Sequence, residues 1–262
     1  LVERADHLSG RFPKDLDALP HPAFHLLDME RYFEILGEAQ AENLVPDQHA
    51  GERLLPFVSS RGCPYSCIFC THQVLDLPWR GRSADGLCAE LDRLRAAYGV
   101  ERVLFLDDLM NLDGPRFAAV TRHMAEVSLP WDAVNGLRAD RLGEDVLRDM
   151  QAAGNRKVTV SAESGDQGVL SRVGKKGLDL SHIEGTARAA AGIGFPCQVH
   201  YVLGFPGERR EELNNTLLHA ARMRRDHGAI PLLQYATPVE GTRLHRKLCE
   251  DGLWADPEAR DR

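Results

Sequence analysis

Short apolar runs alternate with longer stretches of helical apolar spacing from residue 54 onward. The short runs predict strands, because apolar and β-branched residues between turn residues suit a buried strand. These strands are expected near residues 57–59, 103–106, 133–137, 157–163, 198–203 and 230–235. The longer stretches predict amphipathic helices over residues 83–98, from about residue 115, and over residues 144–153, 181–192, 211–225 and 242–249.

This alternation predicts an α/β fold. Strands that alternate with helices form a parallel sheet with right-handed crossovers, and the helices lie outside it. Six repeats are too few for a closed eight-stranded barrel, so we expect a partial (β/α)6 TIM-like barrel. Within it, Ser181 and Glu184 have the spacing of a capping box, which places the start of one helix at Ser181.

The first 53 residues lack this alternation. Prolines at positions 13, 20 and 22 interrupt regular structure, and only a short helix over residues 28–36 is expected. We therefore divide the chain into a linker-like lead-in, residues 1–53, and a core domain, residues 54–262, that includes the start of a C-terminal extension. Because the chain starts at Leu1 in a polar stretch, we expect it to be a segment of a longer protein.

Composition and charge narrow the class of protein. With 43% hydrophobic and 27% charged residues, the chain has the make-up of a soluble globular domain. Its net charge of −7 and its interspersed basic residues do not suggest nucleic acid as a partner. No apolar run approaches the ~20 residues of a membrane span, so no membrane association is expected. Six cysteines in a chain of this length favour a reducing cytoplasm over a disulfide framework.

Three of the cysteines follow the first strand at C-x3-C-x2-C spacing: Cys63, Cys67 and Cys70. Thiolates are the usual ligands of iron–sulfur clusters, and three of them on a [4Fe–4S] cube leave one iron open for chemistry. Zinc with His72 as a fourth ligand is an alternative, as is plain burial. Structural zinc sites more often use two spaced pairs of ligands, however, and no second pair exists here. We favour the iron–sulfur cluster.

Polar or special residues also follow the later strands. Asp107 and Asp108 end the second strand, Arg138 the third and Glu163 the fourth, and a Gly-Phe-Pro-Gly-Glu turn at residues 204–208 ends the fifth. Each has an ordinary explanation as a cap, a turn or a surface residue. The carboxyl ends of parallel strands share one edge, which is where ligands bind in such sheets. Together these residues therefore favour a single site.

The cysteine loop at the end of the first of six βα repeats resembles the radical SAM superfamily. This resemblance spans about residues 56–250. It also rests on Phe69 before the third cysteine and on residues 106–108, 161–165 and 202–208. It implies a [4Fe–4S] cluster whose open iron binds S-adenosylmethionine (SAM). It also implies reductive cleavage of SAM to a 5′-deoxyadenosyl radical, and a one-electron donor such as flavodoxin or ferredoxin as partner.

The resemblance also implies a role for each candidate position. Cys63, Cys67 and Cys70 would ligate the cluster, Phe69 would lie near the adenine, Asp107 or Asp108 would bind the SAM amino group, Arg138 would pair with its carboxylate, Ser161 or Glu163 would hold the ribose hydroxyls, and Gly204 and Gly207 would let the backbone approach the adenine. The chain lacks the Gly-Gly-Glu form of the strand-two motif, which leaves the choice between Asp107 and Asp108 open. Cys88, Cys197 and Cys249 are expected to be packing residues, and His200 is a weaker site candidate.

Three stretches point to one branch of the superfamily. Residues 17–23 resemble the linker that follows a cobalamin-binding domain, and residues 79–83 and 163–167 are similar to the same branch. That branch includes methyltransferases and rearranging enzymes, which implies cobalamin held by a domain outside this chain. The D-x-H-x-x-G signature of such a domain does not occur here. Two alternatives remain: a methylthiotransferase-type radical SAM enzyme, and a non-catalytic barrel with a structural metal site.

Overall fold

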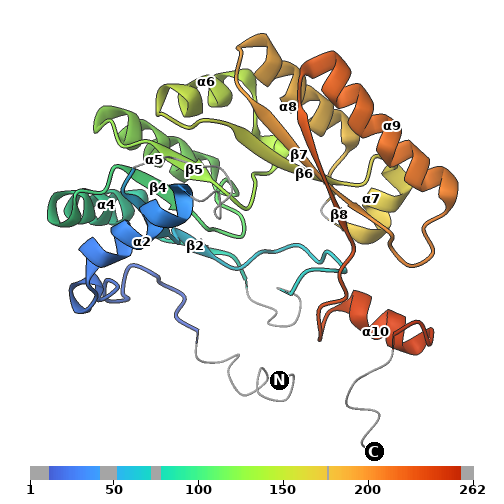
Figure 1. Cartoon of the computed structure of the whole chain (residues 1–262), viewed down its shortest axis with the longest axis horizontal. Coiled ribbons are helices and arrows are strands. Elements are labelled where there is room, and N and C mark those ends of the chain that lie inside the picture. The colour runs from blue at the N-terminus through green and yellow to red at the C-terminus, as the bar shows by residue number, and fades with distance from the viewer. Residues whose placement is uncertain (1–11, 42–51, 72–77, 176, 255–262) are drawn as a thin grey trace, which may run out of the picture.

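A computed structural model describes residues 12–41, 52–71, 78–175 and 177–254. Within these ranges, six parallel strands form the wall of an open barrel (Figure 1). They are β1 (Leu54–Phe57), β4 (Arg102–Phe105), β5 (Trp131–Ala133), β6 (Val158–Glu163), β7 (Cys197–Leu203) and β8 (Ile230–Tyr235). The orders β1-β4-β5 and β6-β7-β8 are both parallel, and a parallel bridge from Leu137 to Val160 joins the two halves. The predicted α/β partial barrel is confirmed.

The helices lie on the outside of this wall. Figure 1 places α4 (Ala84–Tyr98), α5 (Gly114–Glu126) and α6 (Glu144–Ala152) outside the first half, and α8 (Leu180–Gly192) and α9 (Arg210–His227) outside the second. The other helical elements are η1 (Phe24–Leu26), α2 (Met29–Ala41), η2 (Ala139–Arg141), α7 (Gln167–Val173) and α10 (Arg243–Glu250). Helix α4 begins and ends as its sequence predicts: Ser83 Oγ accepts from Gly86 N, and Gly99 closes the helix at φ +63°.

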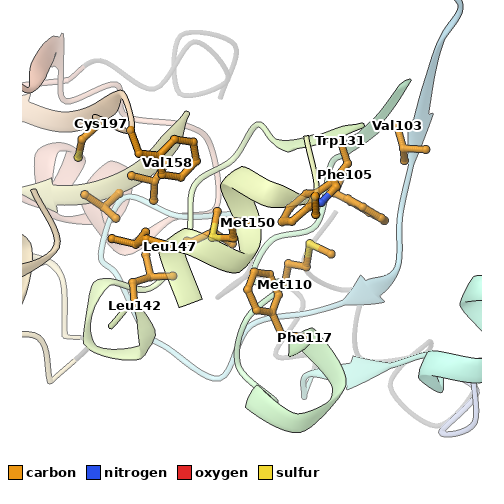
Figure 2. Close-up of a cluster of buried hydrophobic side chains, with 14 of the residues drawn as sticks. Val103, Phe105, Met110, Phe117, Trp131, Leu142, Leu147, Met150, Val158 and Cys197 are labelled. Carbon is orange, nitrogen blue, oxygen red and sulfur yellow. The ribbon is translucent and has the colours of Figure 1, made fainter. Parts of the chain in front are cut away.

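The apolar core fills the space between strands and helices (Figure 2). Trp131 is fully buried, and its ring meets Phe105 and Phe117 edge-on at centroid distances of 5.7 and 5.9 Å. Leu147 and Met150 of α6 continue this core towards β6. Burying large side chains is the main favourable term in folding, so this layer holds the strand ends in fixed positions.

Three predicted boundaries were wrong, each for a local reason. The first strand ends at Phe57, and Ser60–Arg61 (β2) then turns to pair antiparallel with Arg80–Gly81 (β3). The third strand is β5, earlier than residues 133–137, because Gly136 takes φ +87° and breaks the extended run. Helix α8 starts at Leu180 and is capped by Asp179 with His182, so the predicted Ser181 capping box does not form.

The crossover from β6 to β7 carries two helices, α7 and α8, where one was expected. The described part of the lead-in packs against the core, and its helix α2 is longer than predicted. The Asp17 carboxylate accepts from Ser83 N at 2.9 Å, and Arg53 pairs with Glu30 at 2.6 Å. None of the described helices is long and apolar enough to span a bilayer.

Candidate functional site

The cysteine loop bridges the two halves of the barrel. On the side of the first half, Gly62 N donates to Asp108 Oδ2 at 3.2 Å, and Gly62 sits at φ +85°, a conformation that suits glycine. On the side of the second half, Ile68 N donates to Val173 O at 2.9 Å. The Cys67 thiol donates to Gly174 O at 2.8 Å, at the C-terminal end of α7. The backbone that carries the three cysteines is therefore fixed from both sides.

A buried polar group supports the start of this loop. The Asp107 carboxylate is 3% exposed and accepts three hydrogen bonds, from Ser59 N (2.9 Å), Ser59 Oγ (2.7 Å) and Ser60 Oγ (2.5 Å). Arg116 Nη2 donates to Ser59 O (2.8 Å) and Ser59 Oγ (2.7 Å) on the other side. Burial lowers the pKa of Arg116, and the Asp107 charge opposes that shift. Asp107 thus holds β1 and β2 to the end of β4.

Four of the predicted residues line one cleft beside the loop. Its walls are formed by the cysteine loop, by residues at or after the ends of β4, β5 and β6, and by one residue before α8: Cys63, Tyr65, Asp108, Leu109, Asn135, Gly136, Leu137, Arg138, Ser161 and Leu178. Asp108, Arg138 and Ser161 follow or end different strands, so the expected convergence of polar strand ends is present. Asp107 is absent from this lining.

Arg138 is held in this cleft by two contacts. Its side chain pairs with Asp140, with Nε and Oδ1 at 2.7 Å and an Nη2 bond to Oδ2 at 2.9 Å. Its guanidinium lies 4.3 Å from the ring centroid of Tyr65, a residue of the cysteine loop that sequence reasoning missed. The Nη1 atom is buried and has no hydrogen-bond partner within the described ranges. A buried donor of this kind ordinarily meets an acceptor, so a ligand oxygen would complete the site.

Glu163 occupies an unusual backbone conformation at the end of β6. Its φ is +61°, in the left-handed region that non-glycine residues seldom adopt, and the register with β7 shifts between Ser161 and Glu163. Strained residues of this type gather at functional sites, where the surrounding structure enforces them. His200, opposite Ser161 in the register, lies on β7 as predicted.

The turn after β7 closes the same edge. Gly204 and Gly207 have φ of +83° and +77°, in the left-handed region that favours glycine. Glu208 Oε2 accepts from Gly204 N at 2.7 Å and from Phe205 N at 3.1 Å. Phe205 meets Phe69 at a centroid distance of 5.6 Å, so this turn touches the cysteine loop directly.

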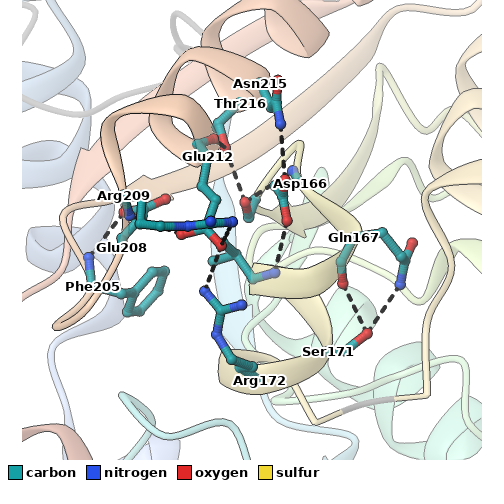
Figure 3. A network of polar contacts seen from close by, with 12 residues as sticks. Asp166, Gln167, Ser171, Arg172, Phe205, Glu208, Arg209, Glu212, Asn215 and Thr216 are labelled. Carbon is teal, nitrogen blue, oxygen red and sulfur yellow. Dashed lines mark hydrogen bonds and ion pairs between the residues drawn. The ribbon is translucent and has the colours of Figure 1, made fainter.

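A polar network on the first turns of α9 ties these loops together (Figure 3). Buried Glu212 accepts from Arg209 N at 2.8 Å and pairs with Arg172 of α7 at 3.1 Å. These bonds, led by the backbone bond from Arg209, lower the pKa of Glu212 to about 2. Thr216 and Asn215 bond to the loop after β6. Sequence reasoning missed this network, although buried positions at helical spacing that carry polar residues were a visible signal.

The donor set fits an iron–sulfur cluster. Three thiols stand on one fixed loop, and Cys63 opens on a cleft that carries a buried Arg138 donor and a carboxylate. Among the described residues, no three His, Cys, Asp or Glu side chains gather closely enough to hold a single metal ion. His72, the fourth ligand of the zinc alternative, lies outside the described residues.

The other cysteines have the surroundings of packing residues. Burial raises the pKa of the Cys197 thiol to about 12 and that of the Cys88 thiol to about 11. Thiols with such pKa values stay protonated near neutral pH and are poor ligands or nucleophiles. Cys249 is half-buried on α10, with its Sγ 3.8 Å from His245 Nε2.

Known proteins with similar sequences include a superfamily of enzymes and two methyltransferases. The sequence profile of the radical SAM superfamily matches residues 57–220. The chain is 30% identical over 251 residues to cytidylyl-2-hydroxyethylphosphonate methyltransferase of Streptomyces wedmorensis, which covers 93% of this chain and 45% of that protein. It is 28% identical over 235 residues to an uncharacterized methyltransferase of Pyrococcus horikoshii, with coverages of 88% and 46%. The chain therefore spans less than half the length of either relative.

One similar solved structure is the radical SAM methyltransferase TsrM from Kitasatospora setae, with cobalamin and a [4Fe–4S] cluster bound. The TM-score is 0.61 at 20% sequence identity, and the match covers 79% of this chain and 39% of that one. At this identity the likeness concerns the fold.

Proposed function

Because the chain belongs to the radical SAM superfamily, we propose that it is the part of a radical SAM enzyme that binds SAM at a [4Fe–4S] cluster and cleaves it reductively. The observation that carries this proposal is the convergence of Cys63, Asp108, Arg138 and Ser161 on one cleft. These residues come from segments far apart in the sequence. The Cys63 thiol suits the cluster, and the other three each have a polar group suited to one part of SAM.

Cys63, Cys67 and Cys70 would hold the cluster. When bound, such a cluster supplies the electron that breaks a carbon–sulfur bond of SAM, which gives methionine and a 5′-deoxyadenosyl radical. The Cys67 thiol must lose its proton to bind iron, and Gly174 O then loses its donor. We propose that an external ferredoxin or flavodoxin delivers the electron.

Asp108, rather than Asp107, would bind the SAM amino group. All three hydrogen bonds to Asp107 come from Ser59 and Ser60, and its carboxylate lies away from the cleft. Asp108 lines the cleft beside Cys63 and accepts from Gly62 N of the cysteine loop at 3.2 Å. A carboxylate there suits the ammonium of the amino acid end of SAM.

Arg138 would meet the SAM carboxylate through its Nη1 group. Asp140 and Tyr65 orient the guanidinium, and a planar fork is well matched to a carboxylate. Ser161 and Glu163 at the end of β6 would hold the ribose hydroxyls. Gly204 and Gly207 would admit the adenine close to the backbone, next to Phe69.

For the reaction, we propose a cobalamin-associated methylation. Support comes from a relative named as a phosphonate methyltransferase and from a similar fold that holds cobalamin. We propose that residues 1–53 lead in from a cobalamin-binding domain and that residues 54–262 form the radical SAM core. The packing of residues 12–41 on α4 would fix such a domain relative to the barrel. A methylthiotransferase remains the alternative within the same superfamily.

The test is anaerobic reconstitution of the chain with iron and sulfide. We expect the absorbance of a [4Fe–4S] cluster, an EPR signal that shifts when SAM is added, and 5′-deoxyadenosine after reduction. A colourless protein with tightly bound zinc would support a structural metal site instead. A cluster whose EPR signal does not change when SAM is added would overturn the proposal.

A further inference from the structure

Glu163 is held in its strained conformation by the residues that follow it. Its left-handed φ of +61° persists only if its neighbours have no freedom to relax. The next residues, Ser164, Gly165 and Asp166, form the link to α7. Their contacts therefore decide where the Glu163 backbone lies.

All three of these residues are bonded to one short stretch of α9. Ser164 Oγ and Thr216 Oγ1 lie 2.9 Å apart, and Gly165 N donates to Thr216 Oγ1 at 3.0 Å. Asn215 Nδ2 donates to Asp166 Oδ2 at 2.9 Å (Figure 3). The side chain of Thr216 is fully buried, so its hydroxyl has no water to replace these partners.

The loop also lies against the helix without any spare space. A Cβ placed on Gly165 would come within 2.8 Å of Thr216 Cα and 2.5 Å of His219 Cβ. The loop can approach α9 this closely only because residue 165 is a glycine. Hydrogen bonding and close packing thus act on the same two residues.

The same end of α9 also holds the turn after β7, residues 204–208. Glu212, one helical turn before Thr216, accepts from Arg209 N and pairs with Arg172. Arg209 follows Glu208, which holds Gly204 and Phe205. The loops after β6 and β7 are therefore both fastened to α9, outside the barrel wall.

We propose that Thr216 is a positioning residue for SAM, which acts by fixing the backbone of Glu163 at the ribose end of the site. This inference rests on the proposed function, since it assumes that Glu163 meets the ribose. Thr216 itself lies on the helix side of the loop and is not among the residues that line the cleft. Loss of its hydroxyl would leave Gly165 N without its acceptor and let Glu163 relax away from the ribose.

The experiment compares Thr216→Val, which has the same shape, with Thr216→Ser, which keeps the hydroxyl. Asn214→Ala, at an exposed position of the same helix, is the control. The readouts are the SAM Kd of the reconstituted protein, by equilibrium dialysis, and hydrogen exchange at Gly165 N in the cluster-free protein. Iron content and thermal stability are measured alongside.

We expect Thr216→Val to weaken SAM binding at least about tenfold. This is the scale of one hydrogen bond to a charged group, here the bond between the Glu163 carboxylate and the ribose. Hydrogen exchange at Gly165 N should become faster. Thr216→Ser and Asn214→Ala should stay within about twofold of wild type. If Thr216→Val does not fold, Asn215→Ala removes only the bond to Asp166 and should show a smaller loss of the same kind.

A folded, iron-loaded Thr216→Val variant that binds SAM as well as wild type would overturn the inference, as would an equal loss in Thr216→Ser. If wild type binds no SAM, the proposed function falls instead. Hydrogen exchange at Gly165 then still reports whether Thr216 fastens the loop, and unchanged exchange would overturn that part as well.

Discussion

Substitutions at the two adjacent carboxylates, Asp107 and Asp108, should have different effects: one on the stability of the fold and the other on SAM binding. The perturbation is Asp→Asn at each position, which keeps the shape of the side chain and removes its charge. Asp107 is 3% exposed and accepts three hydrogen bonds of 2.5–2.9 Å. Asp108 is half-buried and accepts from Gly62 N of the cysteine loop at 3.2 Å.

These contacts give the magnitudes. A hydrogen bond to a charged group contributes about 1.5–3 kcal/mol. An amide at position 107 must point its NH2 either at the N–H of Ser59 or at the hydroxyls of Ser59 and Ser60. The serine hydroxyls can turn, but the N–H of Ser59 cannot, and the nearby guanidinium of Arg116 loses its counter-charge. We expect Asp107→Asn to lower the free energy of unfolding by about 3–5 kcal/mol, the range for breaking a buried charged group's contacts. At about 2–4 °C per kcal/mol in a domain of this size, the melting temperature falls by about 10 °C.

Asp108→Asn should behave in the opposite way. Its carboxylate is half-buried rather than buried, and its bond from Gly62 N is long at 3.2 Å, so the loss of stability should be smaller than at position 107. The SAM amino group would lose a charged partner, and SAM binding should weaken at least about tenfold.

The assay combines urea unfolding of the cluster-free chain with the SAM Kd of the reconstituted chain. An Asp107→Asn variant that keeps its stability and loses SAM binding would contradict these roles. So would an Asp108→Asn variant that binds SAM normally while its stability drops as far as expected for position 107.

Three further predictions concern other parts of the site. Cys67→Ala should abolish cluster assembly and SAM cleavage while Cys249→Ala leaves both intact, and equal iron loss in the two would mean that the ligands are misassigned. Arg138→Lys should keep the iron content but weaken SAM at least about tenfold in dialysis, because a point charge cannot replace the guanidinium fork; unchanged affinity would remove this residue from the site. Burial lowers the pKa of His219 from 6.5, opposed by Glu184, so the unfolded chain binds more protons below about pH 6.5 and stability should fall as pH drops from 7.5 to 5.5. In urea unfolding of the cluster-free chain, His219→Gln should show a smaller fall, and an equal fall would contradict this assignment.

The strand ends of this site could be predicted because periodicity locates them. Apolar runs ending at Leu106, Leu137 and Glu163 were enough to place Asp108, Arg138 and Ser161 near one edge, and the structure has them around one cleft. The choice between Asp107 and Asp108 could not be read from the sequence. Neighbouring residues after a strand point to opposite sides, and only the position of Ser59 and Ser60 decides which side is the cleft.

Contacts between residues far apart in the sequence could not be predicted from the local sequence pattern. Tyr65 stacks on Arg138 only because the cysteine loop and the end of β5 are brought together by the sheet. The link from Thr216 to Gly165 joins residues 51 apart. A partial clue was present in α9, where Glu212, Thr216 and His219 occupy the buried stripe that apolar residues usually fill. Polar residues in such a stripe need buried partners, which the pattern does not name.

Because the cysteine loop contacts both halves of the barrel, cluster binding should affect the rigidity of the barrel as well as supply the chemistry. Within the described sheet, the Leu137–Val160 bridge is the pairing that joins the two halves of the wall. The cysteine loop adds a second connection, from Asp108 in the first half to Val173 and Phe205 in the second. Three ligands on that loop would bind one rigid cluster, which removes conformational freedom from the segment that spans both halves. Cluster loading should therefore tighten the whole cleft edge, including residues such as Arg138 that touch no iron.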